Sequence, residues 1–138
     1  MARRGRRLTG MTEREASHEE ARREGIRAAA ADYMQSWLDG DPDRMRRCLH
    51  PDLAKRRVRD TASGDLALWE VPAGDLIDDA MGGPKLQYAG DFEITILDAD
   101  DEVASVRILS QPFNEYLHLA RFGDRWLVVN ALYRRRAN

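Results

Sequence analysis

The chain has 138 residues, 33% of them charged and 43% apolar, and this balance predicts one globular domain with a core of its own. The formal net charge of −2 argues against a general nucleic-acid-binding protein. No stretch approaches the roughly 20 apolar residues of a membrane-spanning helix, so we expect neither nucleic acid nor membrane as a partner. The only cysteine, Cys48, excludes an internal disulfide and fits a cytoplasmic location.

Residues 1–12 form a basic stretch with four arginines and no apolar stripe. Such a run of like charges predicts a disordered tail, and Met11 is an alternative start of translation. The competing interpretation is an arm that docks nucleic acid or acidic lipid, but four arginines give only a weak, salt-sensitive attraction. We expect residues 135–138 to be a second tail, which leaves 13–134 as the domain.

Apolar side chains at helical spacing predict a long helix over about residues 13–39, which Gly40 ends. Asp41 and Pro42 predict the start of a second helix, as its N-cap and first helical residue, and Pro51 follows its end. The apolar stripe of the first helix contains Ile26, Ala30, Tyr33 and Trp37.

Alternating apolar and polar residues predict six strands, with a short helix over "PAGDLIDDAM" between the second and the third. Helices gathered on one face of an antiparallel meander predict an α+β roll, in which a curved sheet wraps around the N-terminal helices and leaves a central pocket. The expected strands are 54–59, 66–71, 92–97, 103–109, 113–122 and 126–133.

The last two strands are expected to form a hairpin with a three-residue loop, Gly123 to Arg125. That loop pairs Phe122 with Trp126 and His118 with Asn130, whereas a two-residue loop would pair His118 with Val129. Because Tyr116, His118 and Phe122 share one face with Trp126, we expect that face to be the concave one.

His118, Asn130 and Tyr116 are the candidate catalytic residues on this interpretation. A neutral imidazole exchanges a proton near pH 7, the Asn130 amide would orient it or bind a carbonyl oxygen, and the Tyr116 phenol would be a second donor. The alternative is a buried His–Asn hydrogen bond that only satisfies two polar groups of the core.

Four further residues are candidates for ligand binding, because an aromatic ring near the pocket can line it. The same rings can equally be plain core, and a histidine that precedes a proline can be a turn residue. These candidates are Tyr33, Trp37, His50 and Trp126.

Metal and cofactor chemistry lack sequence support. His18, His50 and His118 lie far apart with no paired-ligand motif, and Cys48 has no activating partner. The chain has no glycine-rich dinucleotide motif, phosphate-loop lysine motif or nucleophile elbow. We therefore expect no metal and no cofactor.

Two segments carry a family resemblance: "DYMQSWLDGDPDRMRRCLHPDLAKR" (32–56) and "YLHLARFGDRWLVVNALY" (116–133). They resemble the nuclear transport factor 2-like superfamily, and within it the branch labelled lumazine-binding, near the SnoaL-like polyketide cyclases. The resemblance covers nearly everything beyond the first twenty residues. It implies a cone-shaped domain, usually dimeric through the outer face of its sheet, with a pocket between sheet and helices.

Members of this superfamily include isomerases, dehydratases, epoxide hydrolases, cyclases and proteins with no known activity, so the resemblance leaves the function open. The strand aspartate and the tyrosine–acid pair of the ketosteroid isomerases have no counterpart that we can assign in the sequence. For the paired histidines and tyrosines of the scytalone dehydratases, the only stand-ins are His118, Tyr33, Tyr116 and His50.

The leading hypothesis is a cofactor-free acid–base enzyme, an isomerase, dehydratase or cyclase, acting on an apolar oxygenated, polyketide-like small molecule. The alternatives are a non-catalytic binder of a flat heterocycle and a dimeric accessory domain with an empty cavity. A homodimer is expected through a second apolar face of the meander, made of Leu117, Leu119, Leu127, Val129 and Ala131.

Overall fold

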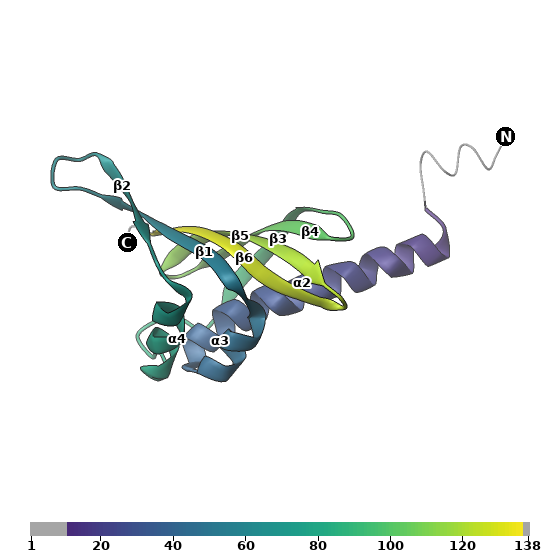
Figure 1. The fold of residues 1–138 in the computed structure, drawn as a ribbon, viewed down its shortest axis with the longest axis horizontal. Helices are drawn as coiled ribbons and strands as arrows, with labels where there is room; N and C mark the ends of the chain where they lie inside the picture. Colours follow the sequence, from purple (N-terminus) through teal and green to yellow (C-terminus); the bar gives the residue numbers. More distant parts are fainter. Residues whose placement is uncertain (1–10, 137–138) are drawn as a thin grey trace.

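A computed structural model describes residues 11–136, so the predicted basic tail lies almost entirely outside the described residues. Two helices come before the first two strands, and a third follows them. A four-stranded meander then completes the sheet (Figure 1). The helices are α2 (Glu13–Asp39), α3 (Pro42–Cys48) and α4 (Ala73–Met81). The strands are β1 (Leu49–Asp60), β2 (Leu66–Glu70), β3 (Phe92–Ala99), β4 (Val103–Ser110), β5 (Phe113–Phe122) and β6 (Arg125–Arg135).

Helix α2 has the bounds that the sequence predicts, because both of its ends carry capping residues. The Thr12 side chain accepts a hydrogen bond from the Glu15 backbone N–H at the start. Gly40 takes a left-handed conformation (φ 69°) at the end. A Cβ at Gly40 would also lie 2.3 Å from the backbone of Gly83, so this position requires glycine twice over. The predicted cap of α3 is also confirmed: Asp41 accepts from the Arg44 backbone N–H.

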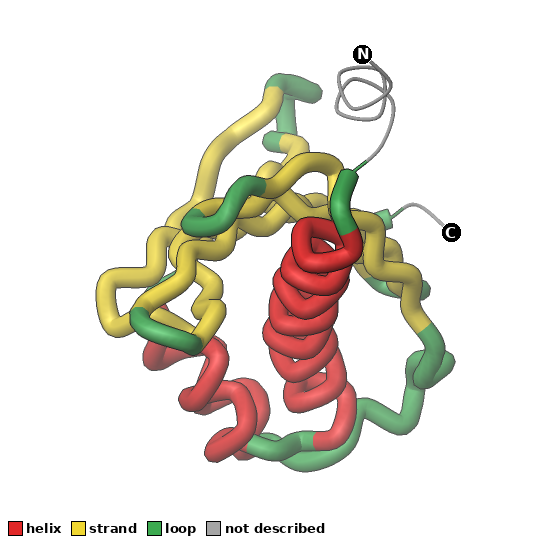
Figure 2. The backbone as a smooth tube through the Cα atoms, turned by 90° about the vertical axis from the view of Figure 1, so that its right-hand side faces the viewer, coloured by secondary structure: helices red, strands yellow, loops and turns green. Residues whose placement is uncertain are grey.

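The six strands form one sheet in the order β2-β1-β6-β5-β4-β3. All neighbours are antiparallel except β1 and β6, which pair in parallel where the β1–β2 hairpin joins the meander. Figure 2 shows α2 lying along the concave side of this sheet, with the short helices at one end. The predicted α+β roll is therefore confirmed, with one parallel pairing that was not predicted.

The β5–β6 hairpin reaches its register by an unexpected route. Its turn has two residues, Gly123 and Asp124, and Phe122 pairs with Arg125, so the predicted three-residue loop is wrong. A bulge farther along then sets Leu119 against Val128 and His118 against Asn130, leaving Val129 as the extra residue of β6. The bulge cancels the shift that the shorter turn introduces. The predicted His118–Asn130 pairing is confirmed although its basis was wrong.

The predicted orientation of β5 is wrong, because the leucines and not the histidine face the core. Leu117 and Leu119 are 0% and 1% exposed, while Tyr116 and His118 are exposed on the outer face. Both faces of β5 carry apolar groups, so alternation alone did not identify the buried one. Aliphatic leucines fill the space against α2 and need no hydrogen-bond partner, whereas an imidazole there would need one.

The C-terminal end of the chain also differs from expectation. Strand β6 continues to Arg135, and Arg136 donates from its guanidinium to the Ser110 carbonyl (2.7 Å). The ordered fold therefore extends past the boundary expected at residue 134.

Candidate functional site

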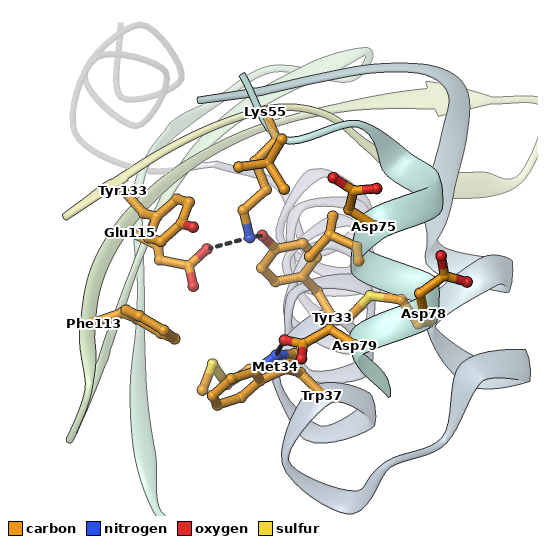
Figure 3. A pocket seen from close by; sticks show the side chains of 13 residues that line it. Tyr33, Met34, Trp37, Lys55, Asp75, Asp78, Asp79, Phe113, Glu115 and Tyr133 are labelled. Carbon is orange, nitrogen blue, oxygen red and sulfur yellow. Dashed lines mark hydrogen bonds and ion pairs between the residues drawn. The ribbon is translucent and has the colours of Figure 1, made fainter. Parts of the chain in front are cut away.

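A cavity of about 470 Å³ lies between the concave face of the sheet and the helices α2 and α4 (Figure 3). Aromatic and aliphatic side chains form most of its wall, and carboxylates of α4 stand along one side. This is the size and character of a small-molecule pocket. Its lining consists of Tyr33, Met34, Trp37, Met45, Lys55, Val71, Asp75, Leu76, Asp78, Asp79, Phe113, Glu115 and Tyr133.

Three distant segments of the chain bring Tyr33, Lys55 and Glu115 together at this cavity. Tyr33 lies on the buried stripe of α2, Lys55 on β1 and Glu115 on β5. Between the two strands runs β6, where Ala131 pairs with Lys55 and Tyr133 pairs with Glu115. The small Ala131 side chain leaves the space above β6 open, so that the lysine and the glutamate reach each other diagonally.

The geometry of this cluster is that of a buried, incompletely satisfied ion pair. Lys55 and Glu115 are 7% and 3% exposed, and the Lys55 Nζ lies 3.8 Å from the Glu115 Oε2. The Lys55 ammonium donates a 2.5 Å hydrogen bond to the Tyr33 hydroxyl and lies 4.4 Å from the centre of the Tyr133 ring. Within residues 11–136 the Glu115 Oε2 has no hydrogen-bond partner. A buried carboxylate oxygen without a donor is costly, which makes it a candidate contact for a ligand.

Burial shifts the proton equilibria of Lys55 and of the two tyrosines beside it. Desolvation lowers the pKa of Lys55, against the opposing attraction of Glu115 and Asp79. Desolvation also raises the pKa of Tyr33 well above its usual value, and the negative charge of Glu115 adds to the effect. The pKa of Tyr133 is likewise raised by burial. The phenols therefore stay protonated as hydrogen-bond donors, and the lysine releases its proton more readily than an exposed one.

A run of aromatic rings continues the wall from the Lys55 cluster. Trp37 meets Phe113 edge-on at 5.3 Å, and Phe113 meets Tyr133 edge-on at 5.2 Å. Tyr88 stacks on Trp37 at 5.7 Å, and the indole N–H of Trp37 donates to Asp79 at 2.5 Å. Interlocked rings of this kind hold a fixed, apolar surface against which a flat molecule can lie.

Of the residues that the sequence proposes for ligand binding, Tyr33 and Trp37 do line the cavity. The other two do not. Trp126 packs beneath α2, where a Cβ at Gly25 would lie 2.8 Å from its ring, and His50 lies against Phe122 with ring centres 4.7 Å apart. Both aromatics complete the packing at places remote from the cavity lining.

The proposed catalytic trio lies on the wrong face for this cavity. The His118 Nδ1 and the Asn130 Nδ2 are 3.3 Å apart, so the predicted contact exists, but both side chains are exposed on the outer face, as is Tyr116. His118 and Asn130 instead border a second hollow on that outer face, together with Ser105 and Ala120. The prediction that they point into the central pocket is wrong because Leu117 and Leu119 take the inner positions of β5.

Sequence reasoning missed Lys55, Glu115 and the α4 aspartates. Lys55 sits in "LAKRRVRD", where four basic residues make every position look solvated. Glu115 offered a signal, since it has the same strand parity as Leu117 and Leu119. Choosing the leucine face as the buried one would have placed a carboxylate inside the sheet.

The described residues offer little for a metal ion or a membrane. Residues 11–136 contain no group of three or more histidine, cysteine, aspartate or glutamate side chains arranged to hold a metal. Within the same range, no helix has the length and apolar character needed to cross a bilayer. Cys48 is buried, and desolvation raises the pKa of its thiol to about 12, as expected for a packing residue.

Solved structures that resemble this chain share its fold. An NTF-2-like protein of unknown function from Silicibacter pomeroyi aligns over 91% of this chain and 100% of its own, with 16% identity and a TM-score of 0.65. An NTF2-like protein of unknown function from Methylobacillus flagellatus aligns over 83% and 91%, with 23% identity and a TM-score of 0.61. A ketosteroid isomerase-like protein from Erwinia carotovora atroseptica aligns over 83% and 96%, with 13% identity and a TM-score of 0.54.

Sequence comparison assigns the family. A search of curated proteins finds no match. The family model described as "Putative lumazine-binding" matches residues 21–134, which include every residue that lines the cavity. The chain therefore belongs to this family, and it shares the fold of the NTF2-like proteins that it resembles.

Proposed function

We propose that this protein is a cofactor-independent acid–base enzyme that acts on an apolar, oxygenated small molecule in the central cavity. The observation that carries the proposal is the buried cluster of Lys55, Tyr33 and Glu115, in which the Glu115 Oε2 lacks a hydrogen-bond partner among the described residues. Buried charges with unsatisfied atoms in an apolar cavity are typical of sites that exchange protons with a ligand.

Each member of the cluster has a distinct role in this proposal. Glu115 is the base, because its side chain lines the cavity and its Oε2 has no hydrogen bond among the described residues. Tyr33 and Lys55 are donors that stabilise the negative charge developing on a substrate oxygen. The role that the sequence suggested for His118 thus passes to Glu115. Isomerisation, dehydration and cyclisation all need this combination of a base and an oxyanion donor.

The test uses nitrobenzisoxazole, a flat heterocycle that opens to a coloured phenolate when one base removes one ring proton. The wild-type protein should open it faster than the same concentration of free acetate. Glu115→Gln should lower that rate about 10²-fold, the contribution typical of a positioned base. Glu115→Asp, which keeps the carboxylate, should retain part of the activity, and His118→Ala should leave it unchanged.

Equal rates for wild type and Glu115→Gln would refute the proposal. Circular dichroism of Glu115→Gln and Glu115→Asp shows whether these two variants remain folded. A loss of activity in the outer-face variant His118→Ala would indicate that the reaction takes place in the second hollow, on the outer face of the sheet.

A second candidate function, the binding of a flat heterocycle without catalysis, is favoured by the aromatic wall of Trp37, Phe113 and Tyr133. The family description suggests lumazine as the probe. Lumazine that quenches tryptophan fluorescence in wild type but not in Trp37→Leu, with no proton transfer to nitrobenzisoxazole, would favour this function.

We also propose that the protein forms a homodimer through the outer face of the sheet. The apolar residues assigned to that face need revision, since Leu117, Leu119 and Ala131 are buried inside. Tyr116 and Leu132 are 44% and 46% exposed there and supply the apolar surface instead. Light scattering of the wild-type protein should give a molar mass twice that of one chain. The Leu132→Asp variant should give the mass of a single chain.

A further inference from the structure

We propose that the substrate is an aldehyde or a ketone and that Lys55 forms a covalent imine with its carbonyl carbon. The inference rests on the proposed function of the central cavity and adds the class of substrate and a nucleophile. Three features of Lys55 support it: its surroundings, its contrast with the second lysine, and the proton-transfer groups beside it.

The Lys55 amine is shielded from solvent and flanked by two aromatic rings. Its Nζ lies between the Tyr33 and Tyr133 rings, 5.0 and 4.4 Å from their centres, at the wall of a cavity of about 470 Å³. This environment keeps water from hydrolysing an imine once it has formed. Burial also lowers the pKa of the amine, which increases the neutral, nucleophilic fraction.

The basic residues of this chain make Lys55 distinctive. Of the 22 lysines and arginines in the sequence, only Lys55 and Lys85 are lysines. A guanidinium would serve as a buried cation, but it does not form an imine with a carbonyl, whereas a lysine amine does. The cavity therefore holds the one type of basic side chain that can form an imine with a carbonyl.

Lys85 provides an internal comparison. Its ammonium donates to three backbone carbonyls, those of Trp37, Asp79 and Gly83, at 2.8 to 3.3 Å. All three N–H groups are thus used by fixed acceptors. Lys55 has instead one hydroxyl and one carboxylate as partners, both of which can exchange protons with it.

The covalent step balances with the groups present. Neutral Lys55 Nζ attacks the carbonyl carbon, and the carbonyl oxygen takes a proton from the Tyr33 hydroxyl to become a carbinolamine. The nitrogen gives a proton to Glu115, which passes a proton to the leaving hydroxyl, so that one water departs and a C=N bond remains. Tyr33 regains its proton from the cationic nitrogen. No oxidant, reductant or metal is consumed.

The experiment traps the imine by reduction. Full-length protein is incubated at neutral pH with naphthaldehyde, a flat apolar aldehyde, and sodium cyanoborohydride, which reduces the imine to a stable amine. Mass spectrometry should show one addition equal to the mass of the aldehyde less one oxygen. Peptide mapping should locate it on Lys55, with occupancy at least about tenfold above Lys85, whose amine must first lose a hydrogen bond to a backbone carbonyl.

Two variants and one competitor complete the design. Lys55→Arg keeps the positive charge and should lose the adduct, while Lys85→Arg should retain it. Naphthol, which has the same ring system without a carbonyl, should protect Lys55 from labelling. Because the mapping is done on wild-type protein, the result does not depend on Lys55→Arg being folded.

The outcomes separate this inference from the proposed function. Equal labelling of Lys55 and Lys85, or no labelling of Lys55, overturns the imine even if nitrobenzisoxazole is opened in a Glu115-dependent manner. Labelling of Lys55 that naphthol does not prevent also overturns it, since the amine would then react outside a binding site. Selective, protectable labelling without nitrobenzisoxazole activity would uphold the imine and refute Glu115 as a general base.

Discussion

Two polar pairs that lie on opposite faces of the sheet differ in almost every physical respect. Inside, Lys55 and Glu115 are nearly excluded from solvent and lie 3.8 Å apart. Outside, His118 and Asn130 approach to 3.3 Å between nitrogens but remain exposed. Both pairs join side chains of different strands, yet only the inner pair is shielded from solvent, and burial there lowers the pKa of Lys55. Solvent exclusion, rather than residue type, distinguishes the candidate site.

The inner pair is also the more costly one. Two charges removed from water lose more solvation than an imperfect contact returns, and removal of one partner leaves the other unpaired. The outer pair keeps its water and loses little when altered. Substitutions in the inner pair should therefore lower the free energy of unfolding much more than substitutions in the outer pair.

The largest effect is expected from breaking the inner pair on one side. Lys55→Leu or Glu115→Leu should each lower the free energy of unfolding by about 3–5 kcal/mol, because each leaves a buried charge without its partner. The double variant should be much more stable than either single one. Urea denaturation of the four proteins measures this, and additive losses would show that the pair is not coupled.

The next largest effect is expected at Tyr33. Tyr33→Phe removes the hydroxyl that accepts the 2.5 Å hydrogen bond of Lys55 and should cost about 1.5–3 kcal/mol, as for other hydrogen bonds to charged groups. Tyr116→Phe removes an exposed hydroxyl of the outer face and is the matched control. A similar cost for the two tyrosines would contradict the contrast between the faces.

An alkaline titration should reveal the same contrast. Burial raises the pKa of Tyr33, so above about pH 10 the unfolded chain loses this proton while the folded protein keeps it. The unfolded state then binds fewer protons, and stability falls as pH rises by up to about 1.4 kcal/mol per pH unit from this residue. Below about pH 10 the residue contributes no pH dependence. Urea midpoints of wild type should decline more steeply than those of Tyr33→Phe; parallel curves would contradict the burial effect.

The smallest effect is expected on the outer face. His118→Ala and Asn130→Ala should each change the free energy of unfolding by no more than about 0.5 kcal/mol, the usual range for exposed positions. A loss well above that value would show that the outer pair is covered, which would fit the proposed dimer interface. The same substitutions in a Leu132→Asp background, in which the dimer should dissociate, show whether a dimer interface covers the pair. A loss that persists in this background would be due to packing within one chain.

Local rules predicted much of the fold. Gly40 and Asp41 mark helix ends by capping chemistry that acts within a few residues, and these two helix bounds followed from them. The strands of the meander were located from alternation to within a few residues. Alternation specifies two faces but does not say which is inside when both carry apolar groups, as in β5.

Local rules did not predict the candidate site, because its residues are far apart in the sequence. Lys55 and Glu115 lie 60 positions apart in the sequence and meet only because β1 joins β6 in parallel. No local pattern predicted that pairing, and charged residues in strands are usually solvated. The bulge at Val129 was equally invisible, although it decides which residues share a row.

The parallel β1–β6 pairing has a consequence for the order of folding. Strands β3 to β6 are joined by short turns, so their pairing closes small loops and can form early. The union of β1 with β6 closes a loop of more than seventy residues, at a larger entropic cost. Tyr33, Lys55 and Glu115 therefore come together only at the late step that docks the N-terminal half on the meander. A chain in which β1 has not yet paired with β6 would contain the β5–β6 hairpin and the outer face of the meander, but it would lack the pocket.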